Sequence, residues 1–352
     1  MPLSNQIYTL LHDGTVIPAH PLALHADRSL DEQGQRLLTK YYLAAGVGGI
    51  AVGVHTTQFE IREPSIGLFE PVLTLAMEEV ETAGRMQDLI KVAGVSGLTA
   101  KAVQEAELAK KLGYDLALVS TNGLSALSEN DLIERAKAIG EVMPLFGFYL
   151  QPAVGGKVLS EEYWAAFCEI EQVFGIKMAP FNRYQTLDVI HAVCNSSRNK
   201  EIALYTGNDD TILVDLLTTF HINTAQGIIK KDIVGGLLGH WAVWTKKAVE
   251  LLEEVKALKK LGSDLPSSIL SRAAKITDSN AAFFDAKNNF RGCIAGIHEV
   301  LYRQGLMRGV WCLSEHEKLS AGQSEEIDRV YRDYPELNDD AFVKDFLKIN
   351  SL

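Results

Sequence analysis

Lys177 is the residue whose type and surroundings point most directly to covalent chemistry. It lies in the stretch FGIKMAP, where three bulky apolar side chains alternate with Gly175, Lys177 and Ala179. In a strand, the period of two places the bulky side chains on one face and Lys177 on the other, directed into the protein. Burial lowers the pKa of a lysine, and a neutral amine can attack a 2-oxo acid to form a Schiff base. A lysine held in an internal ion pair is the alternative interpretation.

Tyr149 is the second candidate, in the stretch LFGFYLQ that covers residues 145–151. The alternation predicts Phe146 and Phe148 on one face, and Tyr149 on the inward face that Lys177 also occupies. A phenol at that place can relay protons between the amine, the substrate and water. A buried tyrosine with a satisfied hydroxyl is the alternative.

A polar segment follows the apolar stretch GIAVGV of residues 49–54. His55, Thr56 and Thr57 come directly after it. Reacting groups in a barrel of parallel strands lie at the carboxyl ends of the strands. We therefore expect this segment to hold the carboxylate of the substrate.

The elements that position these residues repeat along the chain. From residue 17 to about 262, short apolar runs alternate with longer amphipathic segments in eight pairs, which predicts a (β/α)₈ barrel. One helix is predicted from an N-cap at Ser29 to Gly46, and another from Thr99 to Gly113. The expected strands begin near residues 17, 49, 90, 115, 145, 175, 201 and 233. Long helical patterns follow, so we expect a catalytic barrel over 1–262 and a C-terminal α-helical region over 263–352.

The composition and net charge of the chain argue against several classes of binding partner. The 352 residues are 47% hydrophobic and 22% charged, with a net charge of -11 that would repel nucleic acid. Four scattered cysteines are typical of a reducing compartment. The sequence starts without a signal-peptide pattern, and its longest apolar run, residues 41–54, is shorter than the roughly 20 residues that a membrane helix needs. We expect a cytoplasmic protein that binds neither nucleic acid nor membrane.

Several motifs together resemble the dihydrodipicolinate synthase and N-acetylneuraminate lyase family of class I aldolases. They are PLALHADRSLDE, AGVGGIAVGVHTT, KVAGVSGLTAKAVQEAELAKKLGYDLALV, YLQP, GIK and TGNDD, in that order between residues 21 and 240. The resemblance implies an imine lysine at Lys177, a proton-relay tyrosine at Tyr149 and the family's glycine at Gly207. It also implies pyruvate or another 2-oxo acid as substrate, an aldehyde co-substrate, no cofactor, and a homo-oligomer, either a dimer or a tetramer.

The sequence departs from this family at three places. The segment HTTQFE replaces the signature G-T-T-G-E, Asn122 to Leu124 replace a stretch with an interface tyrosine, and Val154 replaces an arginine. These departures make aspartate semialdehyde a doubtful substrate.

Other polar residues are candidates for the missing contacts. Arg183, beside Asn182, has the planar fork that suits a carboxylate or phosphate, although it can also pair with a neighbouring helix. Asn208 and Asp209 can contact substrate hydroxyls, although Asp209 can also cap the following helix.

Two other functions compete with the lyase. A metal-dependent barrel hydrolase would use His20, His55, Asp209 and His240, which all lie at expected strand ends, but the H-x-H pair usual in strand one is missing. The sequence therefore predicts no metal site. We expect His240 to be a histidine packed in the protein interior. The other alternative is a non-catalytic ligand-binding member of the same fold.

Overall fold

The computed structural model describes residues 3–262 and 264–350. The chain divides into two compact units, one of Met1–Thr15 with Ile90–Leu237 and one of Val16–Leu89 with Leu238–Leu352. This division differs from the predicted boundary after residue 262, and that boundary stays a prediction. α9 ends at Leu261 and α10 begins at Ser268.

The first unit is a parallel sheet with its helices. Its strands pair in the order β3, β4, β5, β6, β7, β9, all parallel. Their bounds are β3 Ile90–Val95, β4 Leu116–Val119, β5 Leu145–Tyr149, β6 Val173–Met178, β7 Ala203–Thr206 and β9 Gly227–Leu238. The helices are α1 Asn5–Asp13, α4 Thr99–Lys111, α5 Glu129–Gly140, α6 Glu161–Cys168, α7 Arg183–Asn195 and α8 Ile212–Leu217. β3, β4 and β5 are buried along their whole length, as strands covered on both faces are.

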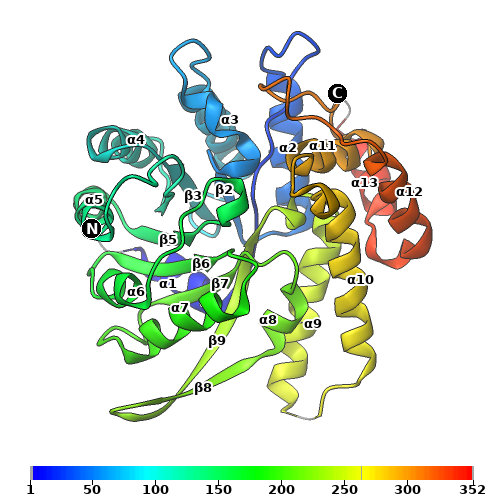
Figure 1. Cartoon of the computed structure of the whole chain (residues 1–352). Coiled ribbons are helices and arrows are strands. Elements are labelled where there is room, and N and C mark those ends of the chain that lie inside the picture. The colour runs from blue at the N-terminus through cyan, green and yellow to red at the C-terminus, as the bar shows by residue number, and fades with distance from the viewer. Residues whose placement is uncertain (1–2, 263, 351–352) are drawn as a thin grey trace. The chain divides into compact units, whose positions relative to one another are not determined.

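A β-hairpin in this unit was not predicted. β8, Thr219–Thr224, pairs antiparallel with the first half of β9 and forms the long arm of Figure 1. The turn uses Gly227 at φ +105°, a conformation that side chains rarely adopt. β9 thus begins six residues before Ile233, but its parallel pairing with β7 begins at Ile233, the residue at which the sequence predicted the eighth strand.

The second unit combines two short strands with most of the helices. β1, Val16–Pro18, and β2, Gly49–Val52, are joined where the His20 amide donates to the Ala51 carbonyl at 2.8 Å. The helices are α2 Glu32–Ala45, α3 Phe69–Thr82, α9 Thr245–Leu261, α10 Ser268–Phe283, α11 Cys293–Arg303, α12 Gln323–Asp333 and α13 Asp340–Leu347. Among the last four, α10, α11 and α12 contact one another (Figure 1).

The ends of α2 test the predicted helix signals. The helix stops at Gly46, which is left-handed with φ +91° as a terminating glycine should be. Its N-cap is Asp31, whose carboxylate accepts from the Gly34 amide at 2.9 Å. The prediction of Ser29 as N-cap is wrong, because the backbone at Ser29 instead pairs with His25 in a turn.

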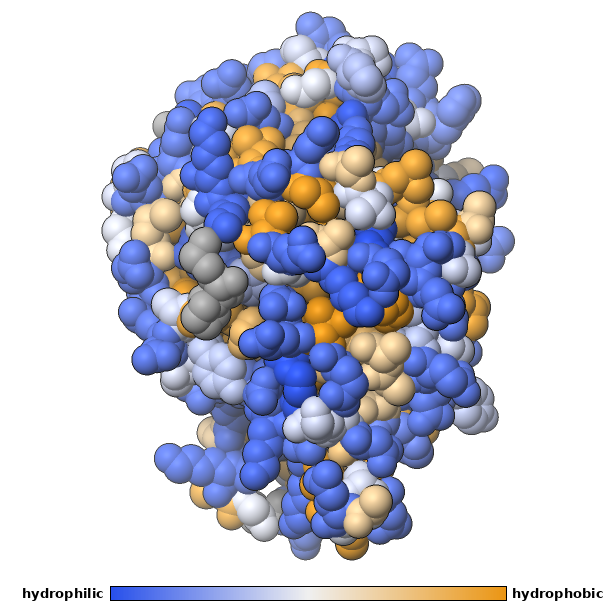
Figure 2. Space-filling model, turned by 90° about the vertical axis from the view of Figure 1, so that its left-hand side faces the viewer, coloured by the Kyte–Doolittle hydropathy of each residue, from blue (hydrophilic) through white to orange (hydrophobic). Residues whose placement is uncertain are grey.

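The fold class follows from the order of elements. Eight strands, β1 to β7 and β9, alternate with helices along the chain, and four further helices follow α9. The fold is the predicted (β/α)₈ barrel with a C-terminal helical region. None of the helices among the described residues is both long and apolar enough to span a bilayer. On the face shown in Figure 2, hydrophobic residues lie between hydrophilic ones, as on ordinary protein surfaces.

A buried polar cluster joins the C-terminal helices of the second unit to α2 and α9. The Tyr41 hydroxyl donates to Asp339 at 2.6 Å and accepts from the Thr245 amide at 2.9 Å. Asp339 also accepts from the Lys246 amide and the Gln304 side chain. Tyr41 is fully buried, so if one of its hydrogen bonds is lost, no water can replace the missing partner of the buried polar group.

We expect Tyr41→Phe to lower the free energy of unfolding by about 1–3 kcal/mol, because it leaves the Asp339 carboxylate and the Thr245 amide short of a partner. Chemical denaturation measures this change. Tyr302→Phe, at a residue that is 50% exposed, is the control and should change stability little. Equal stability of the two variants would contradict the role of the cluster.

Candidate active site

Lys177 lies near the carboxyl end of β6, on the sheet face opposite α6. Ile176 and Gly147 share the other face, where a methyl group added at Gly147 would lie 2.7 Å from Phe167 of α6. Phe148 is the register partner of Lys177 on β5, and its ring centroid is 4.4 Å from the Lys177 Nζ. The predicted orientation of β6, with Ile176 toward the helices and Lys177 away from them, is confirmed.

Burial lowers the pKa of the Lys177 amine. Lys177 is 7% exposed. Loss of solvation lowers the pKa of its amine to about 8, and the negative charge of Asp209 offsets only part of this lowering. With that pKa, about a tenth of the molecules carry a neutral amine at pH 7, against fewer than about one in a thousand for an ordinary lysine. The neutral amine is the form that can attack a carbonyl carbon.

Gly207 lies directly against the Lys177 side chain. A methyl group added at Gly207 would lie 2.6 Å from the Lys177 Cε and 2.8 Å from the Ala179 Cβ. The Gly207 amide also donates to the Met178 carbonyl at 2.6 Å, which ties the end of β7 to β6. The residue after β7 must therefore be glycine if Lys177 is to keep this conformation.

Tyr149 does not point where the sequence analysis placed it. Its ring packs on Trp164 of α6, with centroids 5.2 Å apart, and its hydroxyl both donates to the Leu159 carbonyl and accepts from the Leu159 amide. The prediction that Tyr149 shares a face with Lys177 is wrong, since Phe148 occupies that face. The small residue Gly147 makes room for Phe167 and does not mark the inward face.

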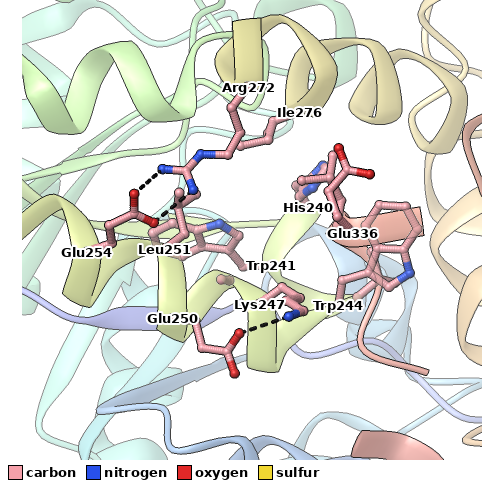
Figure 3. A pocket seen from close by; sticks show the side chains of 13 residues that line it. His240, Trp241, Trp244, Lys247, Glu250, Leu251, Glu254, Arg272, Ile276 and Glu336 are labelled. Atoms are coloured by element: carbon pink, nitrogen blue, oxygen red, sulfur yellow. Dashed lines mark hydrogen bonds and ion pairs between the residues drawn. The ribbon is translucent and has the colours of Figure 1, made fainter. Parts of the chain in front are cut away.

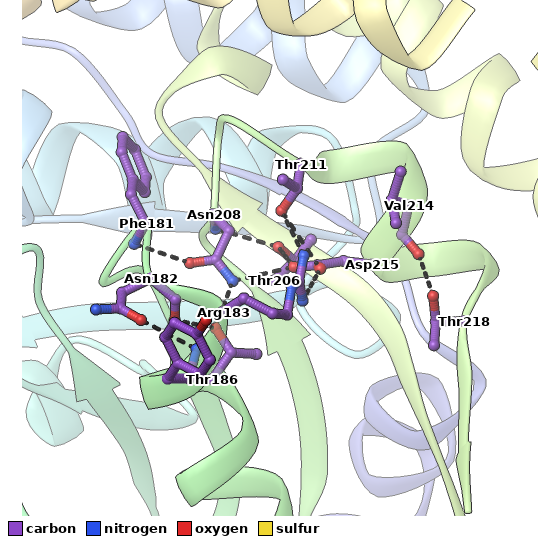
Figure 4. A network of polar contacts seen from close by, with 11 residues as sticks. Phe181, Asn182, Arg183, Thr186, Thr206, Asn208, Thr211, Val214, Asp215 and Thr218 are labelled. Carbon is purple, nitrogen blue, oxygen red and sulfur yellow. Dashed lines mark hydrogen bonds and ion pairs between the residues drawn. The ribbon is translucent and has the colours of Figure 1, made fainter. Parts of the chain in front are cut away.

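A buried carboxylate that the sequence analysis missed organises the loop after β7. Asp215 of α8 is fully buried, and it accepts from Thr206 at 2.7 Å and from the Asn208 side chain at 3.1 Å. Arg183 forms an ion pair with it at 2.6 Å (Figure 4). These contacts fix the residues on both sides of Gly207.

The same network accounts for three predicted substrate-binding residues. Arg183 forms an ion pair with Asp215 of α8 and donates to the Thr211 hydroxyl at 2.9 Å. This is the alternative that the sequence analysis gave for Arg183, a pairing with a neighbouring helix. Asn182 is the N-cap of α7, and its side chain accepts from the Tyr184 and Gln185 amides. Asn208 accepts from the Phe181 amide and donates to Thr186 and Asp215. A substrate role for these residues remains a prediction that would require some of these bonds to be exchanged.

Asp209 lies two residues after Gly207 in the loop that follows β7. It is 5% exposed, and its amide donates to the Gly207 carbonyl at 3.1 Å. It is not the cap of the next helix, because the N-cap residue of α8 is Thr211. Its carboxylate is the charged group that acts on the Lys177 amine.

The segment His55 to Thr57 belongs to the second unit and forms a single 3₁₀ turn after β2. The Thr56 hydroxyl donates to the Ala19 carbonyl at 2.8 Å, and the Thr57 hydroxyl donates to the His20 carbonyl at 2.7 Å. Thr57 also accepts from the Gly53 and Val54 amides. The two threonines thus hold β1 and β2 together, and their predicted contact with a carboxylate is a further role to be tested.

The candidate metal ligands are engaged with the protein. His20 is held through one ring nitrogen by the Pro21 carbonyl and through the other by Thr39, and burial lowers its pKa to about 4. Burial also lowers the pKa of His240 to about 4, and its ring packs on Phe283. Among residues 3–262 and 264–350, no three potential ligands gather in a group that could hold a metal ion.

A pocket of about 250 Å³ lies in the second unit, between α9 and α10 (Figure 3). Trp241 and Trp244 line it together with His240. Its charged side chains pair with one another: Arg272 binds Glu254 through two hydrogen bonds, and Lys247 binds Glu250 at 3.1 Å. None of the predicted catalytic or substrate-binding residues lines it, so the candidate active site remains at Lys177.

We expect Gly207→Ala to abolish reaction of Lys177 with a 2-oxo acid, because the new methyl group overlaps the lysine side chain. Overpacking should also lower the free energy of unfolding by about 1–3 kcal/mol. Gly227→Ala is the control: its φ is strained, but no described atom lies within 4 Å of its added methyl. Borohydride trapping measures the reaction, and normal trapping by Gly207→Ala would contradict the assigned contact.

Comparison with solved structures supports the fold. A dihydrodipicolinate synthase from Bacteroides thetaiotaomicron superposes with a TM-score of 0.71 at 16% identity, over 95% of this chain and 100% of that one. An N-acetylneuraminate lyase from Fusobacterium nucleatum gives a TM-score of 0.67 at 18% identity, over 92% and 99%. At these identities the likeness shows the (β/α)₈ barrel alone.

Comparison of sequences shows the family. Two similar proteins are the 4-hydroxy-tetrahydrodipicolinate synthases of Herminiimonas arsenicoxydans, 27% identical over 55% of this chain, and of Dechloromonas aromatica (strain RCB), 28% identical over 67%. The chain spans 63% and 78% of the lengths of these relatives. The sequence model of the Dihydrodipicolinate synthetase family matches residues 13–226. The match covers more than half of the chain, and the chain belongs to this family.

Proposed function

We propose that the protein is a Schiff-base-forming lyase or synthase of the class I aldolase type that acts on pyruvate or another 2-oxo acid. The observation that carries this proposal is the buried Lys177 amine, whose pKa is lowered to about 8 by desolvation. Family membership supports it, because the curated relatives are named as synthases.

The chemistry starts with the neutral Lys177 amine. It attacks the keto carbon of the substrate, the carbonyl oxygen takes up a proton, and loss of water from the resulting carbinolamine leaves a protonated imine. This imine withdraws electrons from the adjacent carbon, so that a carbon-carbon bond there can be formed or broken. An aldehyde as the second substrate belongs to the proposal.

The binding of the substrate carboxylate is assigned to the segment from His55 to Thr57, as the sequence suggested. In the structure each threonine hydroxyl donates to a backbone carbonyl, so a carboxylate would have to replace one of these acceptors. We also propose a cytoplasmic homo-oligomer, a dimer or a tetramer. The four cysteines are free and buried, which fits a reducing compartment.

A non-catalytic, ligand-binding member of the family is the second candidate. The orientation of Tyr149 favours it, because the phenol expected to relay protons is bonded to Leu159. This candidate and the lyase differ in one outcome, the covalent adduct at Lys177.

We expect borohydride to trap a pyruvyl adduct on Lys177, at a rate that rises about tenfold for each pH unit below pH 8 and levels off above it, as the amine loses its proton. Peptide mass mapping identifies the site and quenched time points give the rate. Lys177→Met, similar in length but without an amine, is the control and should give no adduct.

Two results would contradict this proposal. One is the absence of an adduct on the wild-type chain across this pH range, which would favour the ligand-binding candidate. The other is an adduct on Lys177→Met in equal amount, which would place the reactive amine elsewhere.

A further inference from the structure

The ring of Phe148 presents its face to the amine nitrogen of Lys177. The two residues are register partners on β5 and β6, and the Lys177 Nζ lies over the ring, 4.4 Å from its centroid. Both side chains are buried. A cation within about 6 Å of the centre of an aromatic face is attracted by the electrons of that face, and removal of water strengthens the attraction. Positive charge that develops on this nitrogen is therefore stabilised by the ring.

Close packing keeps the Lys177 side chain at the ring. On the side of β7, a methyl group added at Gly207 would lie 2.6 Å from the Lys177 Cε. Two residues before Lys177, a methyl group added at Gly175 would lie 2.4 Å from the ring of Phe146. The lysine side chain thus lies between the backbone at Gly207 and the ring of Phe148. Its nitrogen has little room to leave the ring when it forms a new bond.

The phenols on the neighbouring strands are directed elsewhere. The Tyr149 hydroxyl of β5 is bonded to the backbone of Leu159. Tyr205 of β7 is the register partner of Lys177, but its hydroxyl donates to the Leu11 carbonyl of α1 at 3.0 Å. The ring beside the amine is that of a phenylalanine, which carries no ionisable group. A contribution of this ring to the chemistry must therefore act on charge and not on proton transfer.

We propose that the Phe148 ring stabilises the positive charge of the protonated imine at Lys177, and that Phe148 is in this way a catalytic residue of imine formation. The contact that carries this inference is the position of the Lys177 Nζ over the ring. The inference rests on the proposed function, because it assumes that Lys177 reacts with a 2-oxo acid.

The step that the ring assists is the loss of water from the carbinolamine. The lone pair of the neutral nitrogen forms the carbon-nitrogen double bond, the carbon-oxygen bond breaks, and the hydroxyl group leaves as water with a proton from the solvent. That proton replaces the one that the Lys177 ammonium gave to the solvent before the attack. The sum is ammonium plus ketone giving protonated imine plus water. Positive charge appears on the nitrogen during this step, at the place where the ring lies.

The ring attracts two cations, the ammonium of free Lys177 and the protonated imine, and this makes its effect depend on pH. Well below the pKa of about 8, a cation is exchanged for another cation, so the two attractions largely cancel. Well above this pKa, a neutral amine becomes a cation, and the attraction favours the imine in full. Asp209, the charged group that acts on the Lys177 amine, stays the same throughout the comparison. A ring that only filled space would act equally at both pH values.

Phenylalanine with one, two or three fluorine atoms on its ring, introduced at position 148 by stop-codon suppression, tests this role. Fluorine draws electrons from the face of the ring and weakens its attraction for a cation, while the size and shape of the ring change little. The same series at Phe146 is the matched control. Phe146 lies on the same strand and the same face, with its edge toward Tyr205 at 5.3 Å between centroids. Circular dichroism checks the folding of each protein.

The measurement is the pyruvate concentration that gives half of the maximal adduct on Lys177, with cyanoborohydride as a slow trap and mass spectrometry as the readout. It is made about one and a half pH units below and above the pKa of about 8. At the higher pH, we expect three fluorine atoms at position 148 to raise this concentration by about tenfold, with one and two atoms in between, since a buried cation–π contact is of this size. At the lower pH, the change should stay within about twofold. The series at Phe146 should match the wild type at both pH values.

A second measurement needs no substrate. The titration midpoint of the Lys177 amine, followed by nuclear magnetic resonance, should fall stepwise by up to about one pH unit along the fluorine series at position 148, because a weaker attraction favours the neutral amine. An unchanged midpoint would show that the ring does not act on the charge of this nitrogen and would overturn the inference.

The outcomes separate this inference from the proposed function. A wild type that forms no adduct at either pH removes the proposed function and, with it, the role of Phe148 in imine formation. A wild type that forms the adduct, with equal pyruvate dependence for the whole series at position 148, overturns the role of Phe148 and leaves the function intact. Equal losses at both pH values would assign Phe148 to packing alone. If the protein with three fluorine atoms does not fold, those with one and two atoms decide between these outcomes.

Discussion

The proposed chemistry depends on keeping one amine, that of Lys177, out of water. A protonated lysine loses solvation when it is buried, and the protein does not return enough opposite charge to Lys177 to offset that loss. The aromatic ring of Phe148, with its centroid 4.4 Å from the Lys177 Nζ, attracts the charged form of the amine, but desolvation outweighs this attraction. The remaining imbalance lowers the pKa, and this raises the fraction of the amine in its neutral form, the form that can attack a carbonyl carbon.

Other residues of the site hold the Lys177 side chain in its buried position. Gly207 leaves the space that the lysine side chain occupies, and Asp215 holds the residues on either side of it. Arg183 forms an ion pair with Asp215, and this pair balances the charge of the fully buried carboxylate. Asp209 is then the acidic group in this unit whose charge acts on Lys177.

Much of the fold could be predicted from the sequence, but only part of the site. Repeated apolar runs and helix patterns indicate the barrel, and the position of Lys177 between two small residues indicates its face correctly. The same logic failed for β5, because parallel strands are buried on both faces and the alternation of bulky and small residues there has no unique direction. Phe167 of α6 fills the place of a side chain at Gly147, and this contact cannot be read from residues 145–151 alone. Asp215 was missed for a similar reason, since its partner Arg183 lies on another helix and an aspartate in an apolar helix carries no motif.

The pKa of the Lys177 amine tests the proposed Schiff-base chemistry most directly. Nuclear magnetic resonance of protein with carbon-13 at the lysine ε position, assigned by comparison with Lys177→Met, follows the amine through its titration without any substrate. We expect a midpoint near pH 8, because desolvation lowers the pKa of the amine to about that value. A midpoint near the ordinary lysine value of about 10.4 would show a hydrated or fully paired amine and would contradict the central claim.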